Sequence, residues 1–288
     1  LLAIPVLEGK KTDKEKFAGA KTTYAVEALM PDGKALQMGT SHNLGQNFAK
    51  AFNIKFLGKD EKEHLPWQNS WGFSTRLIGS LVMVHSDDRG LVLPPRVAPT
   101  QIVIVPIYKN ENKDKIIKKA NEIKSKLKDY NIELDGRDGY TPGWKFNEWE
   151  LKGIPLRIEI GPKDIEKKQV VLVRRDNNNK EFVKLAQLDK KVKDTLEDIQ
   201  NSLFNKAKRS LNSNIVEVSS WNDFVKQIKN RKLVKAFFCG NIKCEDEIKD
   251  KTRGATSRLI SFQQPKKINK CVHCSKEGKF LVIFGKAY

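Results

Sequence analysis

The sequence predicts a multidomain protein of the α+β and α/β classes. Three observations support this prediction: strand patterns recur along the whole chain, amphipathic helix patterns lie between them, and 288 residues suit about two domains. The apolar share of 39% and the charged share of 31% are typical of a soluble globular protein. No apolar run is long enough to cross a bilayer and no leader is recognised, so we expect no membrane partner.

The charge balance favours a polyanionic partner. The chain has 54 Lys and Arg against 35 Asp and Glu, which gives a formal net charge of +19. A basic excess of this size is typical of proteins that bind nucleic acid. The alternative is a lysine-rich composition that only decorates a solvated surface, and charge alone does not separate the two.

The first predicted segment comprises residues 1–99. Residues 22–29 alternate as a strand, and Pro31-Asp32-Gly33 turns the chain into a strand over residues 35–38, which gives an antiparallel pair. Gly39-Thr40-Ser41 is predicted as a turn that ends in helix-capping hydroxyls. Polar residues therefore lie at the ends of buried strands and helices, which is where functional sites commonly form.

The rest of this segment repeats the pattern. Helical spacing from Leu44 to Phe52 predicts a helix, and a second strand ends at Trp71-Gly72 and leads into a helix over residues 77–84. Residues 58–66 are charged and irregular, which is typical of an exposed loop. A proline cluster at residues 94–99 marks the domain boundary.

Residues 100–204 are predicted as a second domain, with a mostly parallel or mixed sheet covered by helices. Its predicted strands are residues 102–107, 131–134, 156–160, 170–173 and 182–185, and its predicted helices are residues 116–127, a helix after Thr141-Pro142-Gly143, and a long helix over residues 192–211. Residues 205–288 are predicted as a third, smaller α/β unit, with strands at 215–218, 235–238 and 280–284 and a helix at 221–228.

Four cysteines in the last unit form two pairs, Cys239-x4-Cys244 and Cys271-x2-Cys274. In a chain without a leader, this spacing predicts a tetrahedral zinc site with four cysteine ligands. Two disulfides, which a reducing cytosol disfavours, and free buried thiols are the alternatives. His273 lies inside the second pair and is an alternative ligand.

Seven motifs of the first segment occur together in one order. They are Glu15-Lys16-Phe17-Ala18-Gly19-Ala20, Gly39-Thr40-Ser41-His42, Leu44-Gly45-Gln46-Asn47-Phe48, Ser70-Trp71-Gly72, Thr75-Arg76, Ile78-Gly79 and Gly90-Leu91-Val92-Leu93-Pro94-Pro95-Arg96. This set resembles class II prolyl-tRNA synthetases of the archaeal and eukaryotic type, and the resemblance continues to the last residue. It implies part of an antiparallel-sheet catalytic core in residues 1–99, an anticodon-binding domain in residues 100–204 and a zinc-binding domain in residues 205–288.

The aromatic residues of these motifs have two interpretations by residue type alone, core packing and pocket lining. Proline has no polar side-chain handle, so a site selects it through a shaped apolar wall and partners for its ammonium and carboxylate. The resemblance implies that the pocket for L-proline is lined by Phe17, His42, Trp71 and Gly72.

The resemblance also implies a nucleotide site. It places Gln37, Thr40 and Ser74 at ATP or Mg²⁺ and makes Arg76 the arginine of motif 3. A planar guanidinium suits stacking and bidentate phosphate contacts, and cations stabilise the charge that gathers at the α-phosphorus. A salt-bridged arginine beside capping residues is the alternative from residue types alone.

The second segment resembles the family's anticodon-binding domain. The matching motifs are Pro142-Gly143-Trp144-Lys145-Phe146, Trp149-Glu150-Leu151-Lys152-Gly153, Pro155, Arg157 and Gly161-Pro162-Lys163-Asp164. The resemblance implies that Glu150, Arg157 and Lys163 read the guanines in the anticodon of tRNA(Pro). Basic side chains can donate to O6 and N7 of guanine, and a carboxylate can accept from its N1 and N2. A surface Glu–Arg pair beside a solvated lysine is the alternative.

Two further expectations come from the resemblance. The zinc at the four cysteines has a structural role, and the terminal carboxylate reaches toward the active site, so Tyr288 is a candidate support residue. An ordinary terminal strand is the alternative for Tyr288.

The sequence departs from the family in one respect. Motif 1, which dimerises the enzymes, motif 2 with its arginine, and the loop that holds the proline nitrogen are absent, and the apolar start Leu1–Val6 is abrupt. We therefore expect a C-terminal portion of a longer, cytoplasmic, homodimeric proline–tRNA ligase that uses ATP and Mg²⁺. The portion alone is expected not to form prolyl-adenylate. A tRNA-binding module without catalysis and a zinc-containing interaction domain without RNA are the alternatives.

Overall fold

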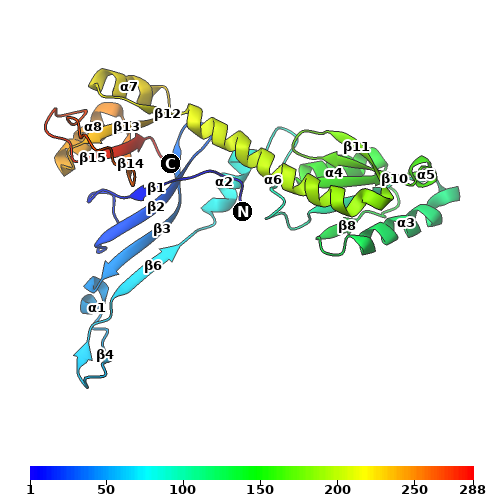
Figure 1. The fold of residues 1–288 in the computed structure, drawn as a ribbon, viewed down its shortest axis with the longest axis horizontal. Helices are drawn as coiled ribbons and strands as arrows, with labels where there is room; N and C mark the ends of the chain where they lie inside the picture. Colours follow the sequence, from blue (N-terminus) through cyan, green and yellow to red (C-terminus); the bar gives the residue numbers. More distant parts are fainter. The chain divides into compact units, whose positions relative to one another are not determined.

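The computed structural model describes residues 1–288 and separates them into two compact units (Figure 1). One unit comprises residues 1–4 and 81–208, and the other comprises residues 5–80 and 209–288. Two of the chain's three crossings between the units fall inside helices, α2 (Arg76–His85) and α6 (Leu188–Ser213). None of the helices combines the length and the apolar character needed to cross a membrane.

The unit of residues 5–80 and 209–288 is built on an eight-stranded sheet in the order β12-β13-β15-β14-β1-β2-β3-β6. Only the β12–β13 pair is parallel. The strands are β1 (Leu7–Lys10), β2 (Thr22–Leu29), β3 (Ala35–Gly45), β6 (Gln68–Gly72), β12 (Ile215–Glu217), β13 (Leu233–Phe238), β14 (Thr256–Ser261) and β15 (Phe280–Gly285). The remaining elements are α1 (Asn47–Ala51), α7 (Trp221–Lys229), α8 (Ile242–Thr252) and an exposed hairpin of β4 (Phe56–Leu57) and β5 (Glu63–His64).

This sheet joins strands from distant parts of the chain. β1 pairs with β14, and Gly9 lies opposite Ser261. A Cβ atom at Gly9 would lie 2.4 Å from the carbonyl oxygen of Ile260, so the close approach requires glycine. Strands of the predicted segments 1–99 and 205–288 thus share one sheet, and the compact units do not follow the predicted boundaries.

The structure corrects the prediction for residues 39–45. Gly39-Thr40-Ser41 is not a helix-capping turn, because β3 continues through it to Gly45 and α1 is short. The reason is pairing on both sides: Thr40 lies opposite Ala25 of β2 and opposite Gly72 of β6. A ladder with two partners satisfies the backbone polar groups and outweighs the local preference for a cap. The predicted antiparallel pair of residues 22–29 and 35–38 is confirmed.

The unit of residues 1–4 and 81–208 contains a five-stranded sheet in the order β11-β10-β9-β7-β8. β7 is parallel to β8 and β9, whereas β10 is antiparallel to β9 and β11, so of the two predicted alternatives, a mostly parallel and a mixed sheet, the mixed sheet is confirmed. Its strands are β7 (Ile102–Pro106), β8 (Ile132–Leu134), β9 (Leu156–Ile160), β10 (Gln169–Arg174) and β11 (Lys180–Lys184). Its helices are α3 (Lys113–Lys126), α4 (Pro142–Leu151), α5 (Pro162–Glu166) and most of α6, with short 3₁₀ turns at Asn110–Asn112 and Leu185–Gln187.

Helices cover both faces of this sheet, which explains why every residue of β7 is apolar and buried. On one face Ile102 packs with Ile116 of α3 and Leu196 of α6. On the other face Val103 packs with Phe146 of α4. α4 begins as predicted, because the Thr141 hydroxyl accepts a hydrogen bond from Trp144 N (3.3 Å) and Pro142 occupies the first turn.

Candidate functional site

Phe17 and His42 lie against each other beside β2. Their ring centroids are 4.8 Å apart. Thr23 Oγ1 accepts a hydrogen bond from Phe17 N (3.0 Å) and lies 2.9 Å from His42 Nδ1. Burial lowers the pKa of His42. The neutral imidazole and the Phe17 ring, which is half exposed, together make an apolar wall that a small ring can contact.

Trp71 lies on the other face of the sheet. In the ladder between β3 and β6, Ser41 is opposite Trp71, and His42 is opposite Ser70. Because successive side chains on a strand point to opposite faces, the Trp71 indole and the His42 imidazole are on different sides. The four residues predicted for the proline pocket are therefore not gathered around one cavity, although Gly72 directly follows Trp71 on β6.

Trp71 instead lines an aromatic cavity of about 330 Å³. Tyr24, Phe73 and Phe262 line the same cavity, and so does Thr40, which was predicted for ATP or Mg²⁺. Gly39 lets the Phe73 ring lie close to β3 in the cavity wall, since a Cβ atom at residue 39 would lie 2.9 Å from Cδ1 of Phe73. The volume is that of a small-ligand site.

Arg76 and Gln37, both predicted for the nucleotide, are in contact. Arg76 Nη1 donates to the carbonyl oxygen of Gln37 (3.3 Å), and the Arg76 side chain is exposed at the start of α2. Ser74 Oγ accepts a hydrogen bond from Arg76 N (3.4 Å). These three predicted residues thus meet where β6 leads into α2, and the guanidinium has donors left for an anion.

Tyr288 lies beside the first residues of β3. Its hydroxyl donates to Asp32 Oδ1 (2.7 Å), and Lys34 Nζ lies 4.6 Å from the centre of its ring. Burial and the Asp32 carboxylate raise the pKa of Tyr288 to about 12. Ala35 N also donates to Lys286 O (2.8 Å). The C-terminal residues are therefore held against Ala35, which precedes Gln37 by two positions in β3.

Arg157 is the most constrained of the three predicted anticodon readers. Its Nε and Nη2 donate to Glu159 Oε1 (3.0 and 2.8 Å), and its guanidinium carbon lies 4.1 Å from the centre of the Phe146 ring. A guanidinium fixed by a carboxylate and a ring presents its remaining N–H groups in one direction. Glu159 was not predicted, although its two-residue spacing from Arg157 on one strand was a usable signal.

Glu150 and Lys163 are placed differently. Glu150 and Arg157 line one small hollow together, and Arg89 Nη1 lies 2.8 Å from Glu150 Oε1. Lys163 is exposed on the short helix α5, which follows the far end of β9. The structure therefore brings Glu150 and Arg157 together and leaves Lys163 beyond the opposite end of the strand.

The four cysteines come together from three places in the chain. Cys239 follows β13, Cys244 lies in the first turn of α8, and the loop of residues 271–274 supplies the other two. Asn241 caps α8 by accepting hydrogen bonds from Lys243 N (2.9 Å) and Cys244 N (3.4 Å). All four sulfur atoms lie within 4.8 Å of one another, and no disulfide joins them.

This donor set fits zinc. Cys244 Sγ is 3.8 Å from Cys271 Sγ, and Cys274 Sγ is 3.7 Å from Cys239 Sγ. A tetrahedron with metal–sulfur bonds of about 2.3 Å has edges of about 3.8 Å. Burial raises the pKa of the Cys244 thiol, a cost that a bound dication would offset. His273 Nδ1 lies 3.3 Å from Cys244 Sγ, so this ring supports a ligand.

Two family models match the chain. The model described as "Prolyl-tRNA synthetase, C-terminal" matches residues 221–288, which include the four cysteines. The model described as "Anticodon binding domain" matches residues 101–195, which include Glu150, Arg157 and Lys163. The two matched segments correspond to the resemblances stated for the second and third predicted segments.

Curated relatives match the chain along its entire length. "Proline–tRNA ligase 2" of Bacillus thuringiensis (strain Al Hakam) is 52% identical over 289 residues, covering 100% of this chain and 60% of the relative. "Proline–tRNA ligase" of Lachnoclostridium phytofermentans is 52% identical with the same coverage, and that of Natranaerobius thermophilus is 50% identical over 291 residues. The chain spans about 60% of the length of these relatives.

Proposed function

The chain belongs to the prolyl-tRNA synthetase family, and on that premise we propose that it contributes to a proline–tRNA ligase. The reaction is activation of L-proline by ATP to prolyl-adenylate, followed by transfer of the prolyl group to the 3′-end of tRNA(Pro). The observation that carries the proposal is 52% identity, over the whole chain, to a protein of that name. ATP and Mg²⁺ are the implied substrate and cofactor, and the implied compartment is the cytoplasm.

The proposed proline site uses the wall of Phe17 and His42. A pyrrolidine ring presents only carbon atoms on one side, so a wall made of the Phe17 ring and the neutral His42 imidazole, whose planes are tilted by 40°, suits it. Thr23 fixes the His42 ring through Nδ1 (2.9 Å) and leaves Nε2 free. Trp71 and Gly72 remain part of the proposed site, although the Trp71 side chain faces the aromatic cavity in the structure.

The proposed nucleotide site lies where Gln37, Ser74 and Arg76 meet, with Thr40 on the same strand as Gln37. The exposed Arg76 guanidinium would bind ATP, and its donors face no carboxylate that would compete. Bound Mg²⁺ would neutralise phosphate charge. Tyr288 is proposed to support this end of β3 through its contacts with Asp32 and Lys34.

The proposed anticodon surface is carried by Glu150, Arg157 and Lys163. The Arg157 side chain is preorganised for recognition, because Glu159 and Phe146 already restrict its rotamers. The four cysteines are proposed to hold a structural Zn²⁺, and the family's homodimer is proposed as the assembly of the whole protein.

A second candidate function is a tRNA-binding module without catalysis. The exposure of the proposed substrate residues favours it, since Trp71 is 74% exposed and Phe17 is 50% exposed. An open site leaves reactants in water, which weakens electrostatic catalysis. The 288-residue chain by itself is expected to show no proline-dependent ATP–pyrophosphate exchange, so exchange is measured with and without the N-terminal part of a full-length relative. Exchange that appears only when both parts are present supports the contribution to a ligase, and binding of tRNA(Pro) without exchange in either case supports the module.

The anticodon assignment has its own test. Arg157→Ala is expected to weaken binding of tRNA(Pro) by about 1–3 kcal/mol, because a lost bidentate contact to guanine costs that much. Arg209→Ala removes an exposed arginine of α6 and serves as the matched control. Binding of tRNA(Pro) that is equal in the two variants would remove Arg157 from the site.

A further inference from the structure

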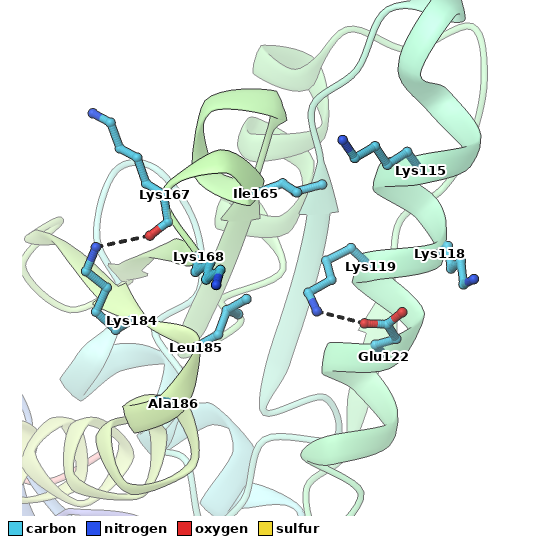
Figure 2. A pocket seen from close by; sticks show the side chains of 10 residues that line it. All are labelled: Lys115, Lys118, Lys119, Glu122, Ile165, Lys167, Lys168, Lys184, Leu185 and Ala186. Atoms are coloured by element: carbon cyan, nitrogen blue, oxygen red, sulfur yellow. Dashed lines mark hydrogen bonds and ion pairs between the residues drawn. The ribbon is translucent and has the colours of Figure 1, made fainter.

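A lysine-lined cavity lies between α3, the end of α5 and the segment after β11. Its volume is about 810 Å³. Six lysines line it together with one carboxylate, Glu122, and an apolar base of Ile165, Leu185 and Ala186 (Figure 2). We call it the lysine pocket; its lysines are Lys115, Lys118, Lys119, Lys167, Lys168 and Lys184.

The charge in the lysine pocket is not balanced from within. Lys119 Nζ donates to Glu122 Oε2 (2.7 Å) and so occupies the one carboxylate. Lys184 Nζ donates to the carbonyl oxygen of Lys167 (3.0 Å), and Figure 2 shows the Lys167 side chain pointing away from this contact. Lys115 and Lys168 form no ion pair and are exposed. The pocket therefore presents several ammonium groups that an external anion can bind.

Helix geometry concentrates these groups. Lys115 precedes Lys118 by three residues and Lys119 by four, so each of the two is its neighbour on the surface of α3, although Figure 2 shows the Lys118 side chain directed away from the cavity. Like charges at this spacing destabilise a helix, and an anion bound between them would remove the repulsion. Figure 2 shows Lys115 and Lys119 on α3 across the cavity from Ile165 and Leu185.

The lysine pocket is separate from Arg157, whereas Lys163 adjoins it, since Lys167 N donates to Lys163 O (3.2 Å). Arg157 lies opposite Val103 in the β7–β9 ladder, and Val103 belongs to the face covered by α4. α3 covers the other face, where Ile102 and Ile116 pack. An RNA segment in the pocket would thus make contacts that are distinct from base reading at Arg157.

The chemistry of the lining identifies the anion. Lysine is a flexible point charge that binds phosphate without a fixed geometry, and no arginine fork or amide side chain, which would read a base edge bidentately, lines the pocket. No aromatic ring lines the pocket on which a base could stack, and no tyrosine, tryptophan or arginine offers a protein-type anchor. We propose that the lysine pocket is a second RNA-binding site that takes the phosphate backbone irrespective of base sequence. This inference goes beyond the proposed function, because RNA of any sequence, with or without a proline anticodon, would bind at the lysine pocket.

The test measures how binding depends on salt. The 288-residue chain is titrated with single-stranded oligouridylate at several salt concentrations, as the wild type and as K115Q/K119Q/K168Q. Each phosphate contact to a single strand contributes about 0.7 to the slope of log K against log salt. The slope for the triple variant is therefore expected to be less steep than the wild-type slope by about two.

Two further variants separate the pocket from charge in general. K128Q/K190Q/K193Q removes the same charge from exposed lysines outside the pocket and is expected to change the slope by less than one. K115R/K119R/K168R keeps the charge and is expected to keep the wild-type slope. Equal slopes for the two glutamine triples, or loss of the slope in the arginine triple, would overturn the proposal.

The remaining outcomes are also decisive. If the glutamine triple fails to fold, K168Q is compared with K193Q, and an equal slope for these two overturns the proposal. Lysine-dependent binding of polyglutamate without lysine-dependent binding of oligouridylate would assign the pocket to an acidic protein instead. The proposed function is tested separately, by comparing the binding of tRNA(Pro) with that of a non-cognate tRNA in wild type and Arg157→Ala. The salt slopes with oligouridylate test only the lysine pocket, so the two proposals can fail independently.

Discussion

Glu27 accepts hydrogen bonds from Arg258 Nη2 through both carboxylate oxygens, at 2.9 and 3.0 Å, inside the eight-stranded sheet. Lys11 Nζ donates to the same carboxylate at 2.6 Å. All three side chains are buried, and they come from β2, β14 and the residue after β1. One carboxylate thus ties the N-terminal strands to the C-terminal ones.

Glu27→Gln is expected to destabilise the chain by about 3–5 kcal/mol, because it leaves two buried cations without a counter-charge. Glu63→Gln is the matched control: its partner, Lys55, is exposed, and pairs of that kind contribute about 0–1 kcal/mol. Urea unfolding monitored by circular dichroism measures both variants. Similar losses for the two would show that the buried cluster is not a major source of stability.

The cluster of four cysteines predicts one zinc per chain. Cys271→Ser removes one of four thiolates and is expected to lower the zinc content and to destabilise residues 221–288, because structural zinc binding is coupled to folding. Ser275→Ala, in the same loop, should leave both properties unchanged. Elemental analysis and thermal unfolding are the measurements. Wild-type protein that folds fully after zinc-free purification and chelation would contradict the structural role.

Acid sensitivity is predicted at Asp87. Hydrogen bonds from Arg175 (2.6 and 2.8 Å) lower the pKa of Asp87 to about 2. Since the folded pKa lies below the unfolded value of about 3.9, the pair stabilises the fold above about pH 4, and this contribution is lost as the pH falls toward about 2. The effect is modest because the Asp87 carboxylate is 43% exposed.

Asp87→Asn should therefore lower stability near neutral pH and flatten the fall in stability between about pH 4 and pH 2. Asp88→Asn, at the exposed neighbouring position, should retain the wild-type profile. Urea unfolding at a series of pH values gives the comparison. A wild-type acid profile in Asp87→Asn would exclude the pair as a source of this dependence.

Phe182 is predicted to stack on an RNA base. It lies opposite Val171 in the β10–β11 ladder, and Val171 lies opposite Glu159, so it shares the sheet face of Arg157. The ring is 69% exposed. Phe182→Ala is expected to weaken binding of tRNA(Pro) by about 1–3 kcal/mol, as loss of a base–aromatic stack does. Phe56→Ala, an exposed phenylalanine of the β4–β5 hairpin, is the control; equal binding by both variants would exclude stacking at Phe182.

Local patterns predicted most elements, and their failures have identifiable causes. The alternation of residues 22–29 and the cap at Thr141 gave correct elements because their signals are contained within a few residues. The hydroxyls at residues 40 and 41 suggested a cap, but two neighbouring strands extended β3 through them. α8 and β14 were not predicted, because mixed polar residues give no clear periodicity there.

The candidate sites divide in the same way. Spacing was sufficient to predict that the four cysteines lie together, because two cysteine pairs at the spacing of zinc ligands suit one tetrahedral set. Spacing was not sufficient for His42 and Trp71, since the register of β3 against β6 places them on opposite faces. Thr23, which fixes His42, could not be predicted because its contact depends on that register.

The sequence by itself determined the two cysteine pairs, most strands of the sheet of residues 102–184 and the resemblance to prolyl-tRNA synthetases, because each depends on residue identity at short spacing. Only the tertiary structure decided that β1 pairs with β14, that Glu27 neutralises Arg258 and that lysines from three separate segments line one pocket. Those relationships join residues distant in the chain, and burial and strand register, which are properties of the whole fold, bring them into contact.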